Sequence, residues 1–254
     1  MAALLELSGV TVQFGGLNAV DNVSFCVEAG EICALIGPNG AGKTTLFNAV
    51  TGNVQTTAGR ILFRGQEIQS LTPHAIAAQG VRRTFQNGGL FGELTALENV
   101  LTGLHVTVES SLTGLLLGMG LARGAERAAT ERARRLLDLM DIRHLEGQLA
   151  GELSGGQQRM VEIVRALATD PPLLLLDEPA VGLAPPMREK LIIVIRKLAK
   201  ERGLGILLIE HAIELVMSIS DRVIVLNYGS KIADAPPQEV RANKVVLEAY
   251  LGHG

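Results

Sequence analysis

A glycine-rich loop that carries a lysine constrains the fold of this chain more than any other feature. The loop, GPNGAGKT at residues 37–44, follows the apolar run EICALIG (31–37) and leads into TTLFNAVTG (44–52), which has helical spacing. Strand–GxxxxGK[ST]–helix is the pattern of a phosphate-binding loop. Its glycines let successive backbone N–H groups approach phosphate oxygens. The sequence therefore predicts an α/β fold in which a buried strand presents this loop to a nucleotide.

The residues of the loop have separate predicted roles. Lys43 would neutralise the β- and γ-phosphates, Thr44 would offer its hydroxyl to Mg²⁺, and Thr45 would bind an α-phosphate oxygen. The positions that would surround the phosphates are Gly37, Pro38, Asn39, Gly40, Ala41 and Gly42.

Two acidic residues end a second apolar run, PLLLLDEP (172–179). Ligands bind at the carboxyl ends of parallel strands, which is where Asp177 and Glu178 would lie. We expect Asp177 to anchor Mg²⁺, directly or through water. Glu178 is suited to orient or deprotonate a water molecule that attacks the γ-phosphate.

Three more residues occupy positions from which a nucleotide could be reached. His211 ends the apolar run LGILLIEH, Gln86 follows VRRTF, and Phe14 lies in VQFGG. A histidine at such a strand end suits either a catalytic or a structural role. Gln86 could reach the metal or the water, and Phe14 could stack on a base or belong to the core.

A second candidate anion-binding segment is LSGGQQR at 153–159. Its Ser154, Gly155, Gly156 and Gln157 precede or begin a predicted helix. The first N–H groups of a helix lack partners within it, and the helix dipole favours negative charge there. The chain thus has two candidate phosphate cradles but one lysine-bearing loop.

Strand-like and helical runs alternate along most of the chain, which indicates an α/β protein. At the start, LLEL, VTVQF and VSFCV are expected to be separate strands joined by glycine and Asx turns. RVIVLNYGSKIADA (222–235) is predicted to be a hairpin. The region 88–160 is mostly helical, and within it one apolar helix face comprises Ala129, Ala133, Leu136, Leu137 and Met140.

The composition of the chain argues against two kinds of protein: one that binds nucleic acid and one that spans a membrane. Apolar residues make up 47% and charged residues 19% of the chain, which is typical of a globular protein. The net charge of −3 argues against a nucleic-acid partner. The longest uncharged apolar stretch, 110–122, is shorter than the roughly 20 residues of a membrane-spanning helix. We therefore expect that the chain does not itself cross a bilayer.

The chain resembles an ABC transporter ATPase over essentially its whole length. Phe14, the phosphate loop, Gln86, LSGGQ, the acidic pair and His211 occur in the order and spacing of that family. The segments that most resemble the ATPase subunits of branched-chain amino acid importers are QFGGLNAVDNVSF (13–25), RTFQNGGLFGELTALENVL (83–101), ILLIEHAIELVMSISDRVIVLNYG (206–229) and the terminal YLG (250–252).

The resemblance implies one ABC ATPase domain over residues 1–254. A RecA-like core with an N-terminal antiparallel β subdomain would comprise about 1–87 and 161–254. A helical subdomain would comprise about 88–160. The implied activity is ATP hydrolysis coupled to transport, with ATP and Mg²⁺ bound and with Glu178, His211, Gln86 and Lys43 as catalytic residues.

The resemblance also implies partners. Two such ATPases, identical or different, pack head to tail, and the LSGGQ segment of each covers the ATP that the other binds. The pair would work on the cytoplasmic face of the membrane with two membrane-spanning permease subunits and, indirectly, a periplasmic or extracellular solute-binding protein. Residues 90–97 would receive a permease helix. No nucleic acid is implied.

One position departs from the family pattern. The loop after the acidic pair usually has an Asp or Asn that touches the opposite nucleotide site, but here Ala184 stands in that place. Other functions also remain open: an importer ATPase for another solute such as an amide or urea, or a soluble ABC ATPase that acts on nucleic acid. A GTPase is disfavoured because NKVV (243–246) lacks the acid of a base-reading motif, and a small-molecule kinase has no need of LSGGQQR.

Overall fold

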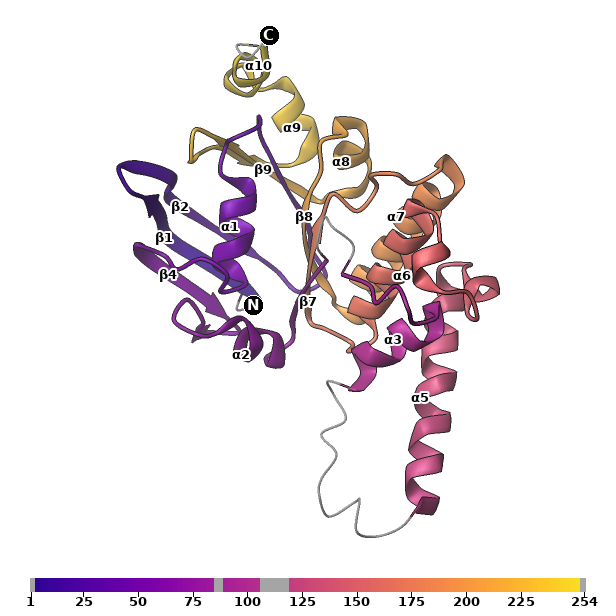
Figure 1. The fold of residues 1–254 in the computed structure, drawn as a ribbon. Coiled ribbons are helices and arrows are strands. Elements are labelled where there is room, and N and C mark those ends of the chain that lie inside the picture. Colours follow the sequence, from indigo (N-terminus) through magenta and orange to yellow (C-terminus); the bar gives the residue numbers. More distant parts are fainter. Residues whose placement is uncertain (1–2, 85–88, 106–118, 252–254) are drawn as a thin grey trace. The chain divides into compact units, whose positions relative to one another are not determined.

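The computed structural model describes residues 3–84, 89–105 and 119–251 (Figure 1). The chain divides into two compact units. The nucleotide-loop unit comprises Met1–Arg83, Pro172–Glu178 and Ile195–Gly254, and the helical unit comprises Thr84–Pro171 and Pro179–Val194.

The nucleotide-loop unit contains an antiparallel sheet with strand order β2-β1-β4-β5. Its strands are β1 (Leu5–Phe14), β2 (Leu17–Val27), β4 (Ala58–Phe63) and β5 (Gln66–Glu67). The prediction that LLEL and VTVQF form separate strands is wrong, because β1 runs through both. Gly9 adopts φ +62° within β1, and the pairing with β4 shifts register between Ser8 and Thr11. The strand absorbs the glycine as a bulge and does not turn there.

A six-stranded mixed sheet forms the second layer of this unit, with strand order β10-β9-β3-β8-β7-β6. β10 pairs antiparallel with β9, which confirms the predicted hairpin, whereas the other neighbours pair in parallel. Every residue of β3, β7 and β8 is buried, as expected for strands covered on both faces. The bounds are β3 (Ile32–Ile36), β6 (Val81–Arg83), β7 (Leu173–Asp177), β8 (Gly205–Ile209), β9 (Arg222–Asn227) and β10 (Ser230–Ala235).

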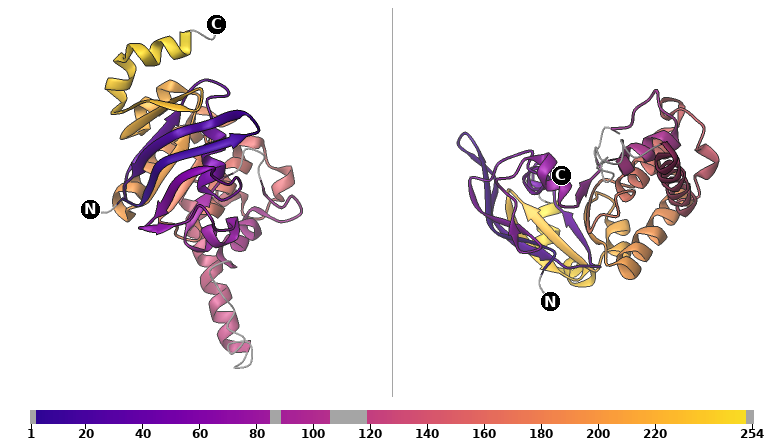
Figure 2. Two further views of the ribbon diagram at one scale, coloured as in Figure 1. Left: turned by 90° about the vertical axis from the view of Figure 1, so that its left-hand side faces the viewer. Right: turned by 90° about the horizontal axis from the view of Figure 1, so that it is seen from below.

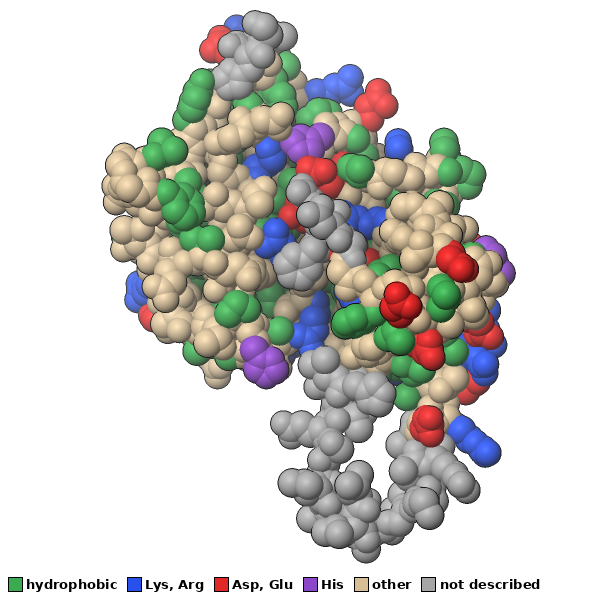
Figure 3. Space-filling view, in the orientation of Figure 1, with side chains coloured by type: hydrophobic (Ala, Val, Ile, Leu, Met, Phe, Trp, Pro, Cys, Tyr) green, Lys and Arg blue, Asp and Glu red, His purple; other side chains and the backbone are tan. Residues whose placement is uncertain are grey.

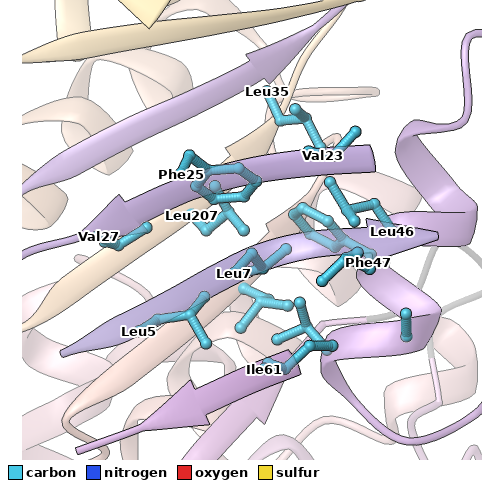
Figure 4. Packing of buried hydrophobic residues seen from close by; sticks show 14 of the residues in the cluster. Leu5, Leu7, Val23, Phe25, Val27, Leu35, Leu46, Phe47, Ile61 and Leu207 are labelled. Carbon is cyan, nitrogen blue, oxygen red and sulfur yellow. The ribbon is translucent and has the colours of Figure 1, made fainter. Parts of the chain in front are cut away.

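The two sheets lie one over the other (Figure 2), and they share one hydrophobic core with helix α1. Leu7 from β1, Leu207 from β8 and Phe47 from α1 belong to this core, and all three are almost fully buried (Figure 4). The core therefore fixes α1, which follows the phosphate loop directly. The helices of the unit are α1 (Lys43–Val50), α2 (Pro73–Ala78), α8 (Ile213–Ile219), α9 (Pro237–Ala242) and α10 (Lys244–Leu251).

The helical unit is built from α3, α5 and α6, with two short 3₁₀ turns. The predicted apolar face of α5 is confirmed at Ala133, Leu136 and Leu137, which are buried. Ala129 is half-buried, and the buried Met140 lies one residue beyond the end of the helix. Helix α7 starts in this unit and ends in the other one, and it stops just before Gly203. The bounds are α3 (Ala96–His105), α5 (Met119–Leu139), α6 (Gly155–Leu167), α7 (Pro185–Arg202) and the 3₁₀ turns Arg143–Leu145 and Ala150–Glu152.

On the face drawn in Figure 3, exposed hydrophobic side chains lie in small groups among polar and charged ones. Within residues 3–84, 89–105 and 119–251, no helix is both long enough and apolar enough to span a bilayer. The apolar stretch 110–122 lies mostly outside the described residues.

Candidate nucleotide-binding and catalytic site

Four parallel strands of the mixed sheet have their carboxyl ends on the same side of the sheet, and the candidate site lies there. β3 leads into the phosphate loop, β7 ends at Asp177, β8 is followed by His211, and β6 ends at Arg83. The parallel registers place Asp177 opposite Ile209 of β8. The carboxyl ends of parallel strands lie together, so residues distant in sequence are gathered at one place.

The backbone of the phosphate loop takes conformations that require glycine. Gly42 has φ +98° and caps α1, and a Cβ at this position would lie 2.3 Å from the carbonyl oxygen of Ala19. A Cβ on Gly40, by contrast, would meet no atom within 4 Å. Gly42 therefore packs against β2, whereas Gly40 leaves open space in which phosphate oxygens can approach the backbone.

Lys43 lies inside the loop that it is predicted to serve. Its Nζ donates to the carbonyl oxygens of Gly37 at 2.7 Å and Pro38 at 2.9 Å, and the residue is 7% exposed. Burial lowers the pKa of this amine, while the carboxylates of Glu178 and Asp177 act in the opposite direction. The amine is thus placed at the centre of the loop, where it can exchange carbonyl oxygens for phosphate oxygens.

The two acidic residues have different environments. Asp177 is 1% exposed, and its Oδ2 accepts a hydrogen bond from Nη2 of Arg83 at 2.8 Å. Glu178 is more accessible, and its Oε1 lies 2.9 Å from Nε2 of His211. A buried carboxylate with a fixed partner suits an anchoring role, whereas an accessible one beside an imidazole suits proton transfer.

The backbone at Glu178 is unusual. Its φ is +51°, which is uncommon for a residue other than glycine. Its N–H donates to the carbonyl oxygen of Ile209 at 2.9 Å, so the end of β8 holds this conformation. Such local strain is concentrated at functional sites, and here it turns the chain away from the direction of β7.

The remaining candidates of this unit lie on its surface. Thr44 is exposed at the start of α1, and Thr45 is half-buried. Phe14 ends β1 with 53% of its surface exposed, so it belongs to no core and is available to stack on a base. Gln86 lies outside the described residues.

The donor set suits Mg²⁺ better than a metal held entirely by the protein. Thr44 and Asp177 provide oxygen ligands, as Mg²⁺ prefers, and this ion usually retains waters and substrate phosphates as further ligands. Among the described residues, no three His, Cys, Asp or Glu side chains are grouped as a metal site.

The second anion-binding segment begins α6 in the helical unit. Ser154 is the N-cap of this helix, and Ser154 and Gln157 form a capping box: the Gln157 N–H donates to Ser154 Oγ at 3.4 Å, and the Ser154 N–H donates to Gln157 Oε1 at 2.9 Å. Gln157 therefore has a structural role that sequence reasoning missed, although serine three residues before glutamine is a known capping pattern.

The two glycines of this segment differ. A Cβ on Gly156 would lie 2.8 Å from the carbonyl oxygen of Gly182, so this position requires glycine for packing. A Cβ on Gly155 would meet nothing within 4 Å. The open side of the helix start is therefore at Gly155, where a ligand could approach the backbone.

Comparison with known proteins identifies the family. The family profile described as "ABC transporter" matches residues 20–181, and that of the "branched-chain amino acid ATP-binding cassette transporter" matches residues 230–254. The chain belongs to the ABC transporter family. This ABC cassette is 46% identical to the high-affinity branched-chain amino acid transport ATP-binding protein BraF of Pseudomonas aeruginosa, over 98% of each chain. It is 43% identical to LivG of Escherichia coli K12, again over 98% of each chain.

Solved structures confirm the predicted fold class of the cassette. A nucleotide-free ATP-binding cassette from an ABC transporter superimposes with a TM-score of 0.84 at 34% identity and covers 98% of this chain and 99% of its own. A dimeric bacterial ABC transporter cassette matches with a TM-score of 0.79 at 27% identity, over 92% of this chain and 98% of its own. The predicted family and fold are thus both confirmed.

Proposed function

We propose that this cassette is the ATP-hydrolysing subunit of an importer for branched-chain amino acids. The observation that carries the ATPase assignment is the contact between Glu178 Oε1 and His211 Nε2, at 2.9 Å, on the sheet edge that also presents the phosphate loop. The solute class is supported by the 46% identity with BraF over 98% of both chains.

The residues of the phosphate loop bind ATP. Backbone N–H groups from Asn39 to Thr45 surround the phosphates, and Lys43 neutralises the β- and γ-phosphates once its amine leaves the carbonyl oxygens of the loop. Phe14, exposed at the end of β1, stacks on the adenine.

Glu178 is the general base of the reaction. It orients a water molecule for attack on the γ-phosphorus and accepts a proton from it as the new P–O bond forms and the bond to ADP breaks. His211 holds the Glu178 carboxylate at its Oε1 atom, and its accessible imidazole can also contact the γ-phosphate. Mg²⁺, held by Thr44, Gln86 and Asp177, would neutralise charge on the phosphates.

The segment at the start of α6 serves a second cassette. Ser154, Gly155, Gly156 and Gln157 contact the γ-phosphate of the ATP bound by that partner, which explains why the chain has two cradles and one lysine-bearing loop. Release of the γ-phosphate removes this contact, so ATP favours the closed pair and hydrolysis opens it. A dimeric cassette is among the related structures.

The pair works at the cytoplasmic face of the membrane with two permease subunits, which receive its motion at residues 90–97, and with an extracytoplasmic solute-binding protein. These partners determine the solute. In this proposal the core binds and hydrolyses ATP, and the helical subdomain, at about 88–160, contacts the permease subunits.

The test is reconstitution in proteoliposomes with the permeases and the solute-binding protein encoded near its gene. We expect ATP-dependent uptake of leucine, isoleucine and valine that is lost with Glu178→Gln. Uptake of urea or an amide in place of these amino acids would overturn the solute class but retain the ATPase. Absence of ATP hydrolysis in the assembled complex would overturn the function itself.

A further inference from the structure

Arg83 links three parts of the site edge, although neither the predicted machinery nor the proposed function uses it. Its Nη2 donates to Asp177 Oδ2 at 2.8 Å, and its Nη1 donates to Asn48 Oδ1 at 2.5 Å. Its guanidinium also lies over the ring of Phe47, 5.5 Å from the ring centre. Asn48 and Phe47 belong to α1, whereas Asp177 ends β7, so one side chain joins the helix of the phosphate loop to the acidic strand.

Both members of this ion pair are buried, with 7% of the Arg83 side chain and 1% of the Asp177 side chain exposed. A buried carboxylate without a compensating charge is strongly unfavourable. The strand pairing that sets Arg83 opposite Leu175 of β7 fixes the reach of the guanidinium. The structure thus places a permanent cation on the carboxylate that, in the proposed function, also anchors Mg²⁺.

We propose that Arg83 is the resident counter-ion of Asp177, a positioning residue that compensates and orients this carboxylate in the metal-free cassette and thereby weakens its hold on Mg²⁺. The inference rests on the proposed function for its metal. A carboxylate already paired with a guanidinium gains less from an arriving dication than an unpaired one. Arg83 therefore makes the cassette stable without metal and keeps the metal exchangeable between cycles.

Two variants separate charge from packing. Arg83→Gln keeps hydrogen-bonding groups but removes the charge, and Arg83→Lys keeps the charge but loses the planar fork. The full chain would be titrated with Mg²⁺ in the presence of a non-hydrolysable ATP analogue, with the thermal midpoint and analogue binding as readouts. We expect Arg83→Gln to lower the metal-free midpoint by about 5 °C or more and to raise the apparent Mg²⁺ affinity about tenfold. Arg83→Lys should stay near the wild type in Mg²⁺ affinity.

Two controls match these variants. Asn48→Ala removes the hydrogen bond that the guanidinium donates to α1 and should leave Mg²⁺ affinity unchanged. Arg222 forms ion pairs with Glu31 at 2.7 Å and with Asp234 at 2.8 Å. It is the first residue of β9 and so lies at the amino end of that strand, whereas Arg83 lies at the carboxyl end of β6. Arg222→Gln should therefore destabilise the protein without changing its response to Mg²⁺.

A double-mutant cycle with Asp177→Asn gives a readout that needs no metal. We expect Asp177→Asn to destabilise the wild type more than it destabilises Arg83→Gln, because in that background the ion pair is already broken. Additive effects, or an Mg²⁺ affinity of Arg83→Gln that is unchanged or reduced, would overturn the inference while leaving the ATPase assignment intact. A wild type that binds neither the analogue nor Mg²⁺ would instead overturn the proposed function.

Discussion

The imidazole Nε2 of His211 lies 2.9 Å from Oε1 of Glu178, although the two residues follow different strands of the sheet, β8 and β7. Glu178 reaches this position through a left-handed backbone conformation that is held by its hydrogen bond to Ile209. The pair stands where a phosphate loop on the neighbouring strand would present a γ-phosphate. This relationship leads to the first prediction.

Glu178→Gln should keep ATP binding and reduce hydrolysis by about 10²–10⁴-fold, because the amide cannot accept the proton of the attacking water. Phosphate release would measure turnover, and size-exclusion chromatography with ATP should show a long-lived dimer. Glu201→Gln, an exposed carboxylate on α7, is the matched control and should behave as the wild type. Turnover at the normal rate in Glu178→Gln would show that the base is elsewhere.

Lys43→Ala should lose nucleotide affinity, since the variant lacks the amine that we propose neutralises the phosphates. Titration with a fluorescent ATP analogue would measure this loss directly. Lys200→Ala removes an exposed lysine at the end of α7 and serves as the control. Equal affinities in the two variants would contradict the assigned role of Lys43.

The two glycines at the start of α6 should respond differently to alanine. Gly156→Ala places a methyl group 2.8 Å from the Gly182 carbonyl oxygen and should lower the free energy of unfolding by about 1–3 kcal/mol. Gly155→Ala meets no neighbour, so its unfolding free energy should stay within about 1 kcal/mol of wild type. Chemical denaturation measures both. In a Glu178→Gln background, Gly155→Ala should nevertheless weaken ATP-dependent dimerisation, and a dimer of unchanged strength would argue against a partner's phosphate at this site.

Ala184 precedes Pro185, the first residue of α7, and its carbonyl oxygen accepts from the Arg188 N–H at 3.0 Å. Ala184→Asp would supply an N-cap side chain and should stabilise the protein by about 1 kcal/mol. It should also alter the cooperativity of ATP hydrolysis in an assembled complex, because a carboxylate could hydrogen-bond across the interface. Unchanged steady-state kinetics, with the stability gain present, would separate the capping effect from the coupling effect and remove the basis of the latter.

We expect the stability of the protein to depend on pH through the phenol of Tyr250. Partial burial, which leaves 37% of the residue exposed, raises the pKa of its phenol from 10.0 to about 12, against a smaller opposing effect of a hydrogen bond with the Gly37 backbone. Between these values the unfolded chain has lost the proton that the folded protein retains, so stability falls as pH rises from about 10 to about 12. Below this interval the phenol is neutral in both states and its contribution is fully present.

Tyr250→Phe should therefore flatten the decline of the thermal midpoint over that interval, measured by circular dichroism. Tyr228→Phe is the control, because Tyr228 is 75% exposed in the turn between β9 and β10. If both variants decline as steeply as the wild type, Tyr250 does not titrate as the structure implies.

Local sequence patterns determined much of this protein. The loop from Gly37 to Thr44 could be identified because its glycines, lysine and threonine lie within one short segment between a strand and a helix. The buried face of α5, with Ala133, Leu136 and Leu137, followed from helical periodicity. These features depend on neighbours a few residues away, so the chain itself specifies them.

Contacts between distant segments were decided by tertiary structure alone. No local pattern in VRRTF marks Arg83 as part of the site, and only the pairing of β6 with β7 brought its guanidinium to Asp177. The continuity of β1 through Gly9 likewise depended on β4, whose Gly59 approaches it so closely that a Cβ would lie 2.3 Å from the Gly9 carbonyl oxygen. Sheet register joins residues that no local pattern relates, because hydrogen-bonded neighbours in a sheet can be any distance apart along the chain.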